Sequence, residues 1–268
     1  MLANLVAYPT DENGLRVGAN LSANKSHRHW SHMLMMHPLR TMNWEQKENR
    51  ELMKKSVDFW LHTGGGRGLK AWSHAAAVSL YAGMGDGDMA LQNLNRHHDD
   101  RRFVMPNGMY IEGAPVIECA LIAGRSLQDM LLQSWGDPSS QDDYAVASKI
   151  RVFPAIPDAW QDVSFHDLRT EGAFLVSAER GGGKTQWIRV KSLAGEPCRI
   201  VHGMEKAPVV VTGNGKKIKF KTLGNGTIEL ALAKGEEILL VADKAVGEVS
   251  VEPIEMDPEE CNYWGLKK

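Results

Sequence analysis

The stretch over residues 71–90, AWSHAAAVSLYAGMGDGDMA, determines the architecture of the first half of the chain. Its apolar residues recur at the spacing of one helical face, at Trp72, Ala76 and Leu80. Glycines from Gly83 onward break that helix, and Asp86 or Asp88 can cap a second helix over 89–95. The stretch therefore predicts a pair of helices joined by a short turn.

Helical periodicity extends to both sides of this pair. Apolar residues repeat at helical spacing over 53–61 and again over 123–131, and the glycine-rich run 63–68 separates the first of these helices from the pair. Helix pairs in series can form a bundle, a solenoid or a closed toroid, and periodicity leaves all three open.

The pattern changes near Ser148, where apolar residues begin to alternate over short runs, as they do in β-strands. Strands are expected over 174–180, 185–191, 208–212, 217–221 and 237–242. The basic run 216–221 alternates lysine with apolar residues and predicts one solvated strand face. The run GGGKT over 181–185 lies between two expected strands, so it predicts a hairpin turn rather than a phosphate-binding loop.

These patterns predict a helical domain over 1–147 and an antiparallel sheet domain over 148–268, with a peripheral tail from Gly247. The polar run 136–143 is expected to be an exposed loop. Two prolines in the run 150–160 forbid a long helix and favour an extended crossing between the domains.

Composition excludes several classes of function. The chain has 268 residues, 43% of them hydrophobic, and a net charge of −2, so it offers no broad basic field for nucleic acid. No apolar run is long enough to cross a membrane, and the first residues lack the pattern of a secretion signal, so no targeting segment is expected in this sequence. Its three cysteines are far apart and lack metal-ligand spacing, which predicts neither a disulfide framework nor a metal site, and no cofactor is expected.

The run over 26–38, SHRHWSHMLMMHP, is the candidate ligand site. Imidazole and guanidinium groups beside an aromatic face suit a hydroxyl-rich ligand. If the run is helical, His29 and His32 share a face and can meet one ligand together. Two other interpretations stay open: a zinc site built on these two histidines, and a structural role in which buried histidine and tryptophan bond to the backbone.

Four strings in this order resemble family 95 of the glycoside hydrolases, which is typified by inverting α-L-fucosidases. They are SHRHWSHML over 26–34, the stretch 71–90, VIE at 116–118 followed by MLLQS at 130–134, and FPAIPDAW over 153–160. The resemblance covers residues 26 to 195. It implies a partial (α/α)6 toroid of helix hairpins followed by an antiparallel β-sandwich, and it implies that the chain is the C-terminal part of such an enzyme.

The resemblance also implies roles for particular residues. Counting back without a gap from 129–134 places the family's base-side aspartate at Glu118, and Glu112 is the competing candidate because its loop carries glycine and proline. The sugar-binding end of the toroid is then lined by His27, Arg28, His29 and His32, with Trp30 and Trp72 as stacking or wall residues.

The family's general acid has no counterpart in this sequence, so we expect the chain alone to hydrolyse little or nothing. The expected partners are a glycan substrate and an upstream polypeptide that completes the toroid, and the parent enzyme is expected in the periplasm or outside the cell. An incomplete toroid also exposes apolar helix faces, which predicts association or poor solubility. The alternatives are a non-catalytic carbohydrate-binding or scaffold protein and, third, a metal-dependent hydrolase built on the histidines.

Overall fold

The computed structural model describes residues 6–136, 148–213 and 215–242. The chain forms two compact units that divide between Leu127 and Gln128. The boundary predicted at 147/148 stays a prediction, because the residues just before it lie outside the described part. Most of the expected loop 136–143 and the tail from Gly247 also lie outside the described residues.

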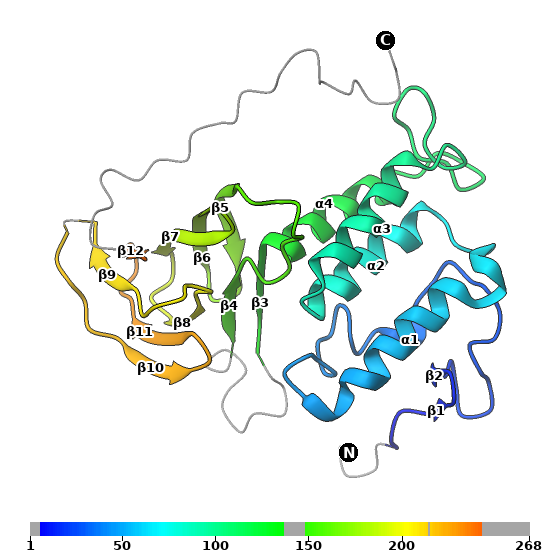
Figure 1. The fold of residues 1–268 in the computed structure, drawn as a ribbon, viewed down its shortest axis with the longest axis horizontal. Helices are drawn as coiled ribbons and strands as arrows, with labels where there is room; N and C mark the ends of the chain where they lie inside the picture. The colour runs from blue at the N-terminus through cyan, green and yellow to red at the C-terminus, as the bar shows by residue number, and fades with distance from the viewer. Residues whose placement is uncertain (1–5, 137–147, 214, 243–268) are drawn as a thin grey trace. The chain divides into compact units, whose positions relative to one another are not determined.

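The first unit is helical (Figure 1). A short hairpin of β1 (Thr10–Asp11) and β2 (Gly14–Leu15) precedes the helices. The helices are α1 (Arg50–His62), α2 (Ala71–Gly83), α3 (Gly87–Asp99) and α4 (Glu118–Leu131), and the last turn of α4 belongs to the second unit. All four helices expected from periodicity are therefore confirmed.

Local chemistry explains where the helices begin and end. Every residue of α2 except Trp72 is buried, so α2 is the central helix of its unit. Asp86 caps α3, because its side chain accepts a hydrogen bond from the backbone N–H of Met89 at 3.0 Å. His97, near the end of α3, contacts the carbonyl of Ala71 at 2.8 Å, which fixes the two helices antiparallel.

The second unit is a sandwich of two five-stranded sheets (Figure 1). One sheet has the order β10-β11-β8-β4-β3 and the other the order β5-β6-β7-β12-β9. All neighbours are antiparallel except β4 and β8. The strands are β3 (Leu132–Trp135), β4 (Lys149–Val152), β5 (Val163–Thr170), β6 (Phe174–Gly181), β7 (Lys184–Ser192), β8 (Pro197–Val201), β9 (Val209–Thr212), β10 (Lys221–Gly224), β11 (Thr227–Ala231) and β12 (Glu237–Val241).

A single apolar core lies between the two sheets. Alternate residues of most strands point into it, which is why the sequence alternates, whereas the residues of β10 are all exposed. Its fully buried members include Val176, Ile188, Val190, Cys198, Ile200, Ile238 and Leu240. A helical region followed by an antiparallel β-sandwich is the fold class that the sequence predicted.

Two details of the second half were predicted wrongly. The run 217–221 is not a strand, because β10 begins only at Lys221. The lysines of the run are nevertheless exposed, and Ile218 and Phe220 pack against the sandwich core. The run 150–160 begins as a sheet strand, β4, rather than as a crossing between the domains.

Among the described residues, no helix has the length and apolarity needed to cross a membrane.

Candidate functional site

The segment 26–30 lies in irregular backbone against the helices, held by three hydrogen bonds. The indole N–H of Trp60 donates to the carbonyl of His27 at 2.8 Å, and the Ser73 hydroxyl donates to the carbonyl of Arg28 at 2.8 Å. The Gly68 N–H donates to the Ser26 hydroxyl at 2.8 Å. These bonds anchor the segment, and the side chains of His27, Arg28 and His29 are exposed.

The helical geometry considered for this segment is not found. Its only helical turn is a short 3-10 helix at Ser31–Met33, which begins after His29. His29 is exposed, whereas His32 is buried and burial lowers its pKa. The two histidines therefore do not share a helical face.

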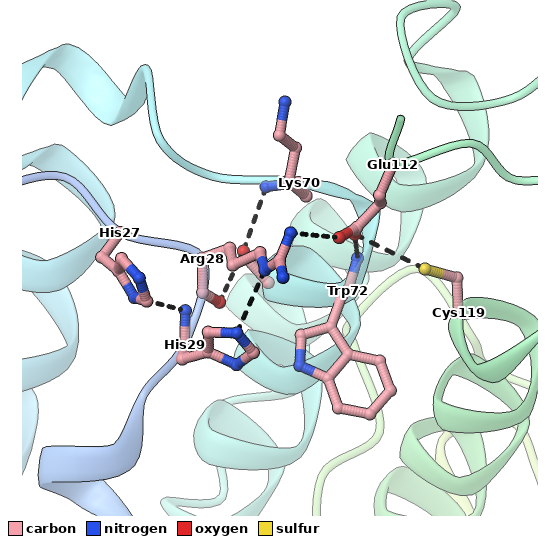
Figure 2. A network of polar contacts seen from close by, with 8 residues as sticks. His27, Arg28, His29, Lys70, Trp72, Glu112 and Cys119 are labelled. Atoms are coloured by element: carbon pink, nitrogen blue, oxygen red, sulfur yellow. Dashed lines mark hydrogen bonds and ion pairs between the residues drawn. The ribbon is translucent and has the colours of Figure 1, made fainter. Parts of the chain in front are cut away.

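A polar network links His27, Arg28 and His29 (Figure 2). The Arg28 Nε–H donates to Nε2 of His29 at 3.0 Å, and the His29 backbone N–H donates to Nδ1 of His27 at 3.1 Å. Burial, followed by the charge of Arg28 and by His27, lowers the pKa of His29. His29 is thus neutral near pH 7, with Nε2 as an acceptor and its other ring nitrogen as a donor.

Glu112 is the carboxylate of this network (Figure 2). Its side chain is only 8% exposed, and its Oε2 lies 3.6 Å from the Arg28 guanidinium. Its Oε1 accepts the backbone N–H of Trp72 at 3.3 Å, one of the unpaired amides in the first turn of α2. A guanidinium and a helix N-terminus together compensate the charge of this carboxylate.

Cys119 completes the surroundings of Glu112. Its thiol donates to Oε1 of Glu112 at 3.6 Å. Burial first, and then the negative charge of Glu112, raise the pKa of Cys119 to about 12. The thiol is therefore a hydrogen-bond donor to the carboxylate and not a nucleophile at neutral pH.

The loop 103–116 presents Glu112 through its own backbone pairing. Ile111 N–H donates to the carbonyl of Phe103 at 2.8 Å, Glu112 N–H to that of Ala114 at 3.0 Å, and Val116 N–H to that of Tyr110 at 3.0 Å. The loop is thus folded back on itself, and Glu112 lies in the short turn between the bridged residues Ile111 and Pro115.

The two candidate tryptophans differ in accessibility. Trp30 is buried, packs against Trp60 and Trp72 with ring centroids 6.3 and 5.6 Å away, and donates its indole N–H to the carbonyl of His37 at 3.2 Å. Trp72 is half-buried, and its indole N–H has no acceptor among the described residues. Of the two, Trp72 is the one with a face near the network.

Glu118, the residue favoured by counting along the sequence, lies at the first position of α4 and is exposed. Within the described part of the chain no hydrogen bond or ion pair joins it to the segment 27–32, whereas Glu112 is joined directly. Counting along the chain could not show that the loop 103–116 folds back onto α2. The only sign of Glu112 in the sequence was the glycine and proline of its loop. The catalytic role of either glutamate stays a prediction.

No group of three or more potential metal ligands occurs among the residues that the structure describes.

Comparison with known families places these observations in context. The model of the glycosyl hydrolase family 95 catalytic domain matches residues 19–116, which include every member of the network except Cys119. The model of the glycoside hydrolase family 95 C-terminal domain matches residues 145–240, which include strands β4 to β11 of the sandwich. No curated protein matches the sequence.

One solved structure is similar to this chain over most of its length. Ara127N-Se, a GH127 beta-L-arabinofuranosidase from Geobacillus stearothermophilus T6, is 13% identical, with a TM-score of 0.27. The similarity covers 94% of this chain and 39% of that one, so the chain spans well under half the length of that protein.

Proposed function

We propose, on the premise that this chain belongs to glycoside hydrolase family 95, that the network around Arg28 and Glu112 holds a glycan and supplies the carboxylate that activates water. The proposed substrate is a terminal α-L-fucosyl residue or a closely related sugar, cleaved with inversion. The observation that carries the proposal is the contact of Glu112 with both Arg28 and the first turn of α2.

The chemistry of the network suits a sugar. Imidazole groups and a guanidinium offer hydrogen-bonding atoms to hydroxyl groups, and the side chains of His27, Arg28 and His29 are exposed to a ligand. Trp72 adds a half-buried aromatic surface beside them. A carboxylate among such groups can orient a water molecule toward the anomeric carbon.

Inversion also needs a second carboxyl group, which lies roughly 6.5–9.5 Å from the first and protonates the leaving oxygen by direct contact. The contacts within the described residues bring one carboxylate to the network. We therefore propose that the proton donor comes from a partner polypeptide whose helices complete an (α/α)6 toroid with α1 to α4. His32 and Trp30 support the site from beneath in this proposal, since both are buried.

Ligand binding to the purified chain tests the site. Saturable binding of 2′-fucosyllactose, followed by saturation-transfer NMR and calorimetry, is expected. Glu112→Gln should weaken binding about tenfold, because an amide loses the charge that Arg28 and the α2 terminus compensate. Glu118→Gln is the matched control and should change binding less than twofold, as its carboxylate is exposed. Equal effects of both variants, or no binding by the wild-type chain, would contradict the proposal.

A further inference from the structure

The helical unit contains a cavity beside the first turn of α2, and none of the described residues of the Glu112 network lines it. Its volume is about 560 Å³, and α1 and α3 both end at its wall. Small-molecule sites commonly measure about 300–1,000 Å³, so the cavity has room for a small ligand. Its lining includes Leu61, Leu69, His74, Arg96, Asp99 and Arg102.

His74 is the buried polar group on this wall. It lies two residues after Trp72, which is about 200° further around α2, so its side chain points away from the flank that carries the Trp72 ring. His74 is only 7% exposed, and it lines the cavity. The cavity and the network therefore lie on different flanks of the same helical turn.

Asn93 fixes which ring nitrogen of His74 carries the proton. The Asn93 Nδ2 donates to the carbonyl of Met89 at 2.9 Å, so the amide oxygen Oδ1 is the atom directed at His74. The His74 Nδ1 lies 3.3 Å from this oxygen and donates to it. Burial lowers the pKa of His74, so the ring is neutral near pH 7 and Nε2 keeps a lone pair. No described residue bonds to Nε2, which is thus an acceptor for a ligand.

Arginine and aspartate side chains line the cavity alongside His74. Arg96 and Asp99, in the last turn of α3, are exposed, and neither forms an ion pair within the described part of the chain. Arg102 is already paired, because its Nε–H donates to the two carboxylate oxygens of Asp100 at 2.9 and 3.0 Å. The unpaired guanidinium can donate to a ligand, and the unpaired carboxylate can accept from it.

This mixture of donors and acceptors selects among ligand classes. An anion such as phosphate would meet the Asp99 carboxylate, the His74 lone pair and the negative ends of two helix dipoles. A cation would meet the guanidinium of Arg96. A hydroxyl group both donates and accepts, so a neutral polyhydroxylated ligand suits all of these groups. Leu61 and Leu69 supply an apolar surface against which the C–H face of a sugar ring can pack.

We propose that this cavity is an accessory carbohydrate site that holds a neutral monosaccharide unit. The His74 Nε2 and the Asp99 carboxylate accept from its hydroxyl groups, and Arg96 donates to them. The site does not depend on the function proposed for Glu112, because it is built from different residues. The dissociation constant is expected to be about 1–10 mM, since Arg96 and Asp99 are exposed to water and each of their hydrogen bonds contributes little.

NMR of the isotope-labelled chain tests this site through the ring nitrogens of His74. D-galactose, D-glucose and L-fucose are each added to about 50 mM, which is above the expected dissociation constant. At least one of them should shift the Nε2 signal of His74 along a saturating curve, because a hydroxyl group donates to that nitrogen. Inorganic phosphate at the same ionic strength should not. No saturating shift with any of the three sugars, or a larger shift with phosphate, would overturn the proposal.

Variants separate this site from the network. Arg96→Met should weaken sugar binding about five- to tenfold, because it removes the donor and keeps an unbranched side chain. Arg67→Met is the matched control, since Arg67 is also exposed and does not line the cavity. Glu112→Gln should leave the affinity within about twofold, so failure of the function proposed for Glu112 is distinguishable from failure here. Circular dichroism verifies that each variant is folded. Equal effects of the two arginine variants, or loss of this binding in Glu112→Gln, would refute a separate site.

Discussion

Glu112 owes its position to groups that are distant in sequence. Arg28 comes from the segment before the helices, the Trp72 amide from the start of α2 and the Cys119 thiol from α4. Each donates toward one carboxylate that is almost completely covered by protein. A carboxylate desolvated to this extent is tolerated only when it is compensated, so the three donors act together as a support for its charge.

Buried histidines make the helical unit sensitive to acid. His97 is fully buried, stacks on Tyr110 with centroids 4.5 Å apart, and burial lowers its pKa to about 4. The unfolded chain takes up this proton near pH 6.5 and the folded chain only near pH 4. The free energy of unfolding should therefore fall as the pH drops from about 6.5 to about 4, by up to about 1.4 kcal/mol per pH unit for this residue.

Urea unfolding at pH 7 and pH 5 measures this dependence. His97→Gln should reduce the loss of stability between the two values, while the exposed His62→Gln should leave it unchanged. A wild-type chain equally stable at both values would show that burial of His97 does not control the response to acid.

The elements around the site depend on one close approach of backbone. A Cβ atom at Gly68 would lie 2.3 Å from the carbonyl oxygen of Ser26, so only glycine permits the segment 26–30 to lie against the start of α2. The sequence showed Gly68 as part of a helix break, and the close approach to Ser26 is visible only in three dimensions. The capping of α3 by Asp86, by contrast, was predictable because it depends on residues three apart.

Gly68→Ala is expected to displace this segment. The chain should lose about 1–3 kcal/mol of unfolding free energy, because a backbone atom cannot yield as a flexible side chain does. Binding of 2′-fucosyllactose should weaken as well, since His27 to His29 would move. Gly18→Ala, where nothing lies within 4 Å, is the control for thermal unfolding and for binding. If Gly68→Ala binds 2′-fucosyllactose as tightly as the wild type, the close approach of Gly68 to Ser26 does not position the binding residues.

Removal of the α3 cap gives an independent check on the helical unit. Asp86→Ala should lower the free energy of unfolding by about 1 kcal/mol, because the backbone N–H of Met89 loses its acceptor. Asp88→Ala, at a position that also precedes the predicted helix, tests whether the cap is specific to Asp86. If chemical denaturation shows a larger loss of unfolding free energy for Asp88→Ala than for Asp86→Ala, the assignment of the cap to Asp86 is contradicted.

At the scale of the whole molecule, the sequence predicted the two-part architecture because helices and strands impose different apolar periods. It missed β3, because Leu132–Trp135 directly follows a helix without a turn signal. It also missed β8, which is short and begins with proline. The segment containing Arg28 was recognised from its composition. Glu112 was ranked second, and a buried Trp30 bonded to the backbone was only the alternative interpretation, because both depend on contacts across the fold.

The central claim is that this chain supplies the carboxylate that activates water but not the proton donor. Hydrolysis of α-L-fucosyl fluoride, compared with 2′-fucosyllactose, tests it most directly, since fluoride leaves without being protonated whereas a sugar alcohol needs an acid. The purified chain should release fluoride, Glu112→Gln should reduce that rate at least about 100-fold, and Glu118→Gln should not. Turnover of fucosyllactose should remain undetectable in all three proteins. Rapid hydrolysis of fucosyllactose, or fluoride release that survives Glu112→Gln, would contradict the claim.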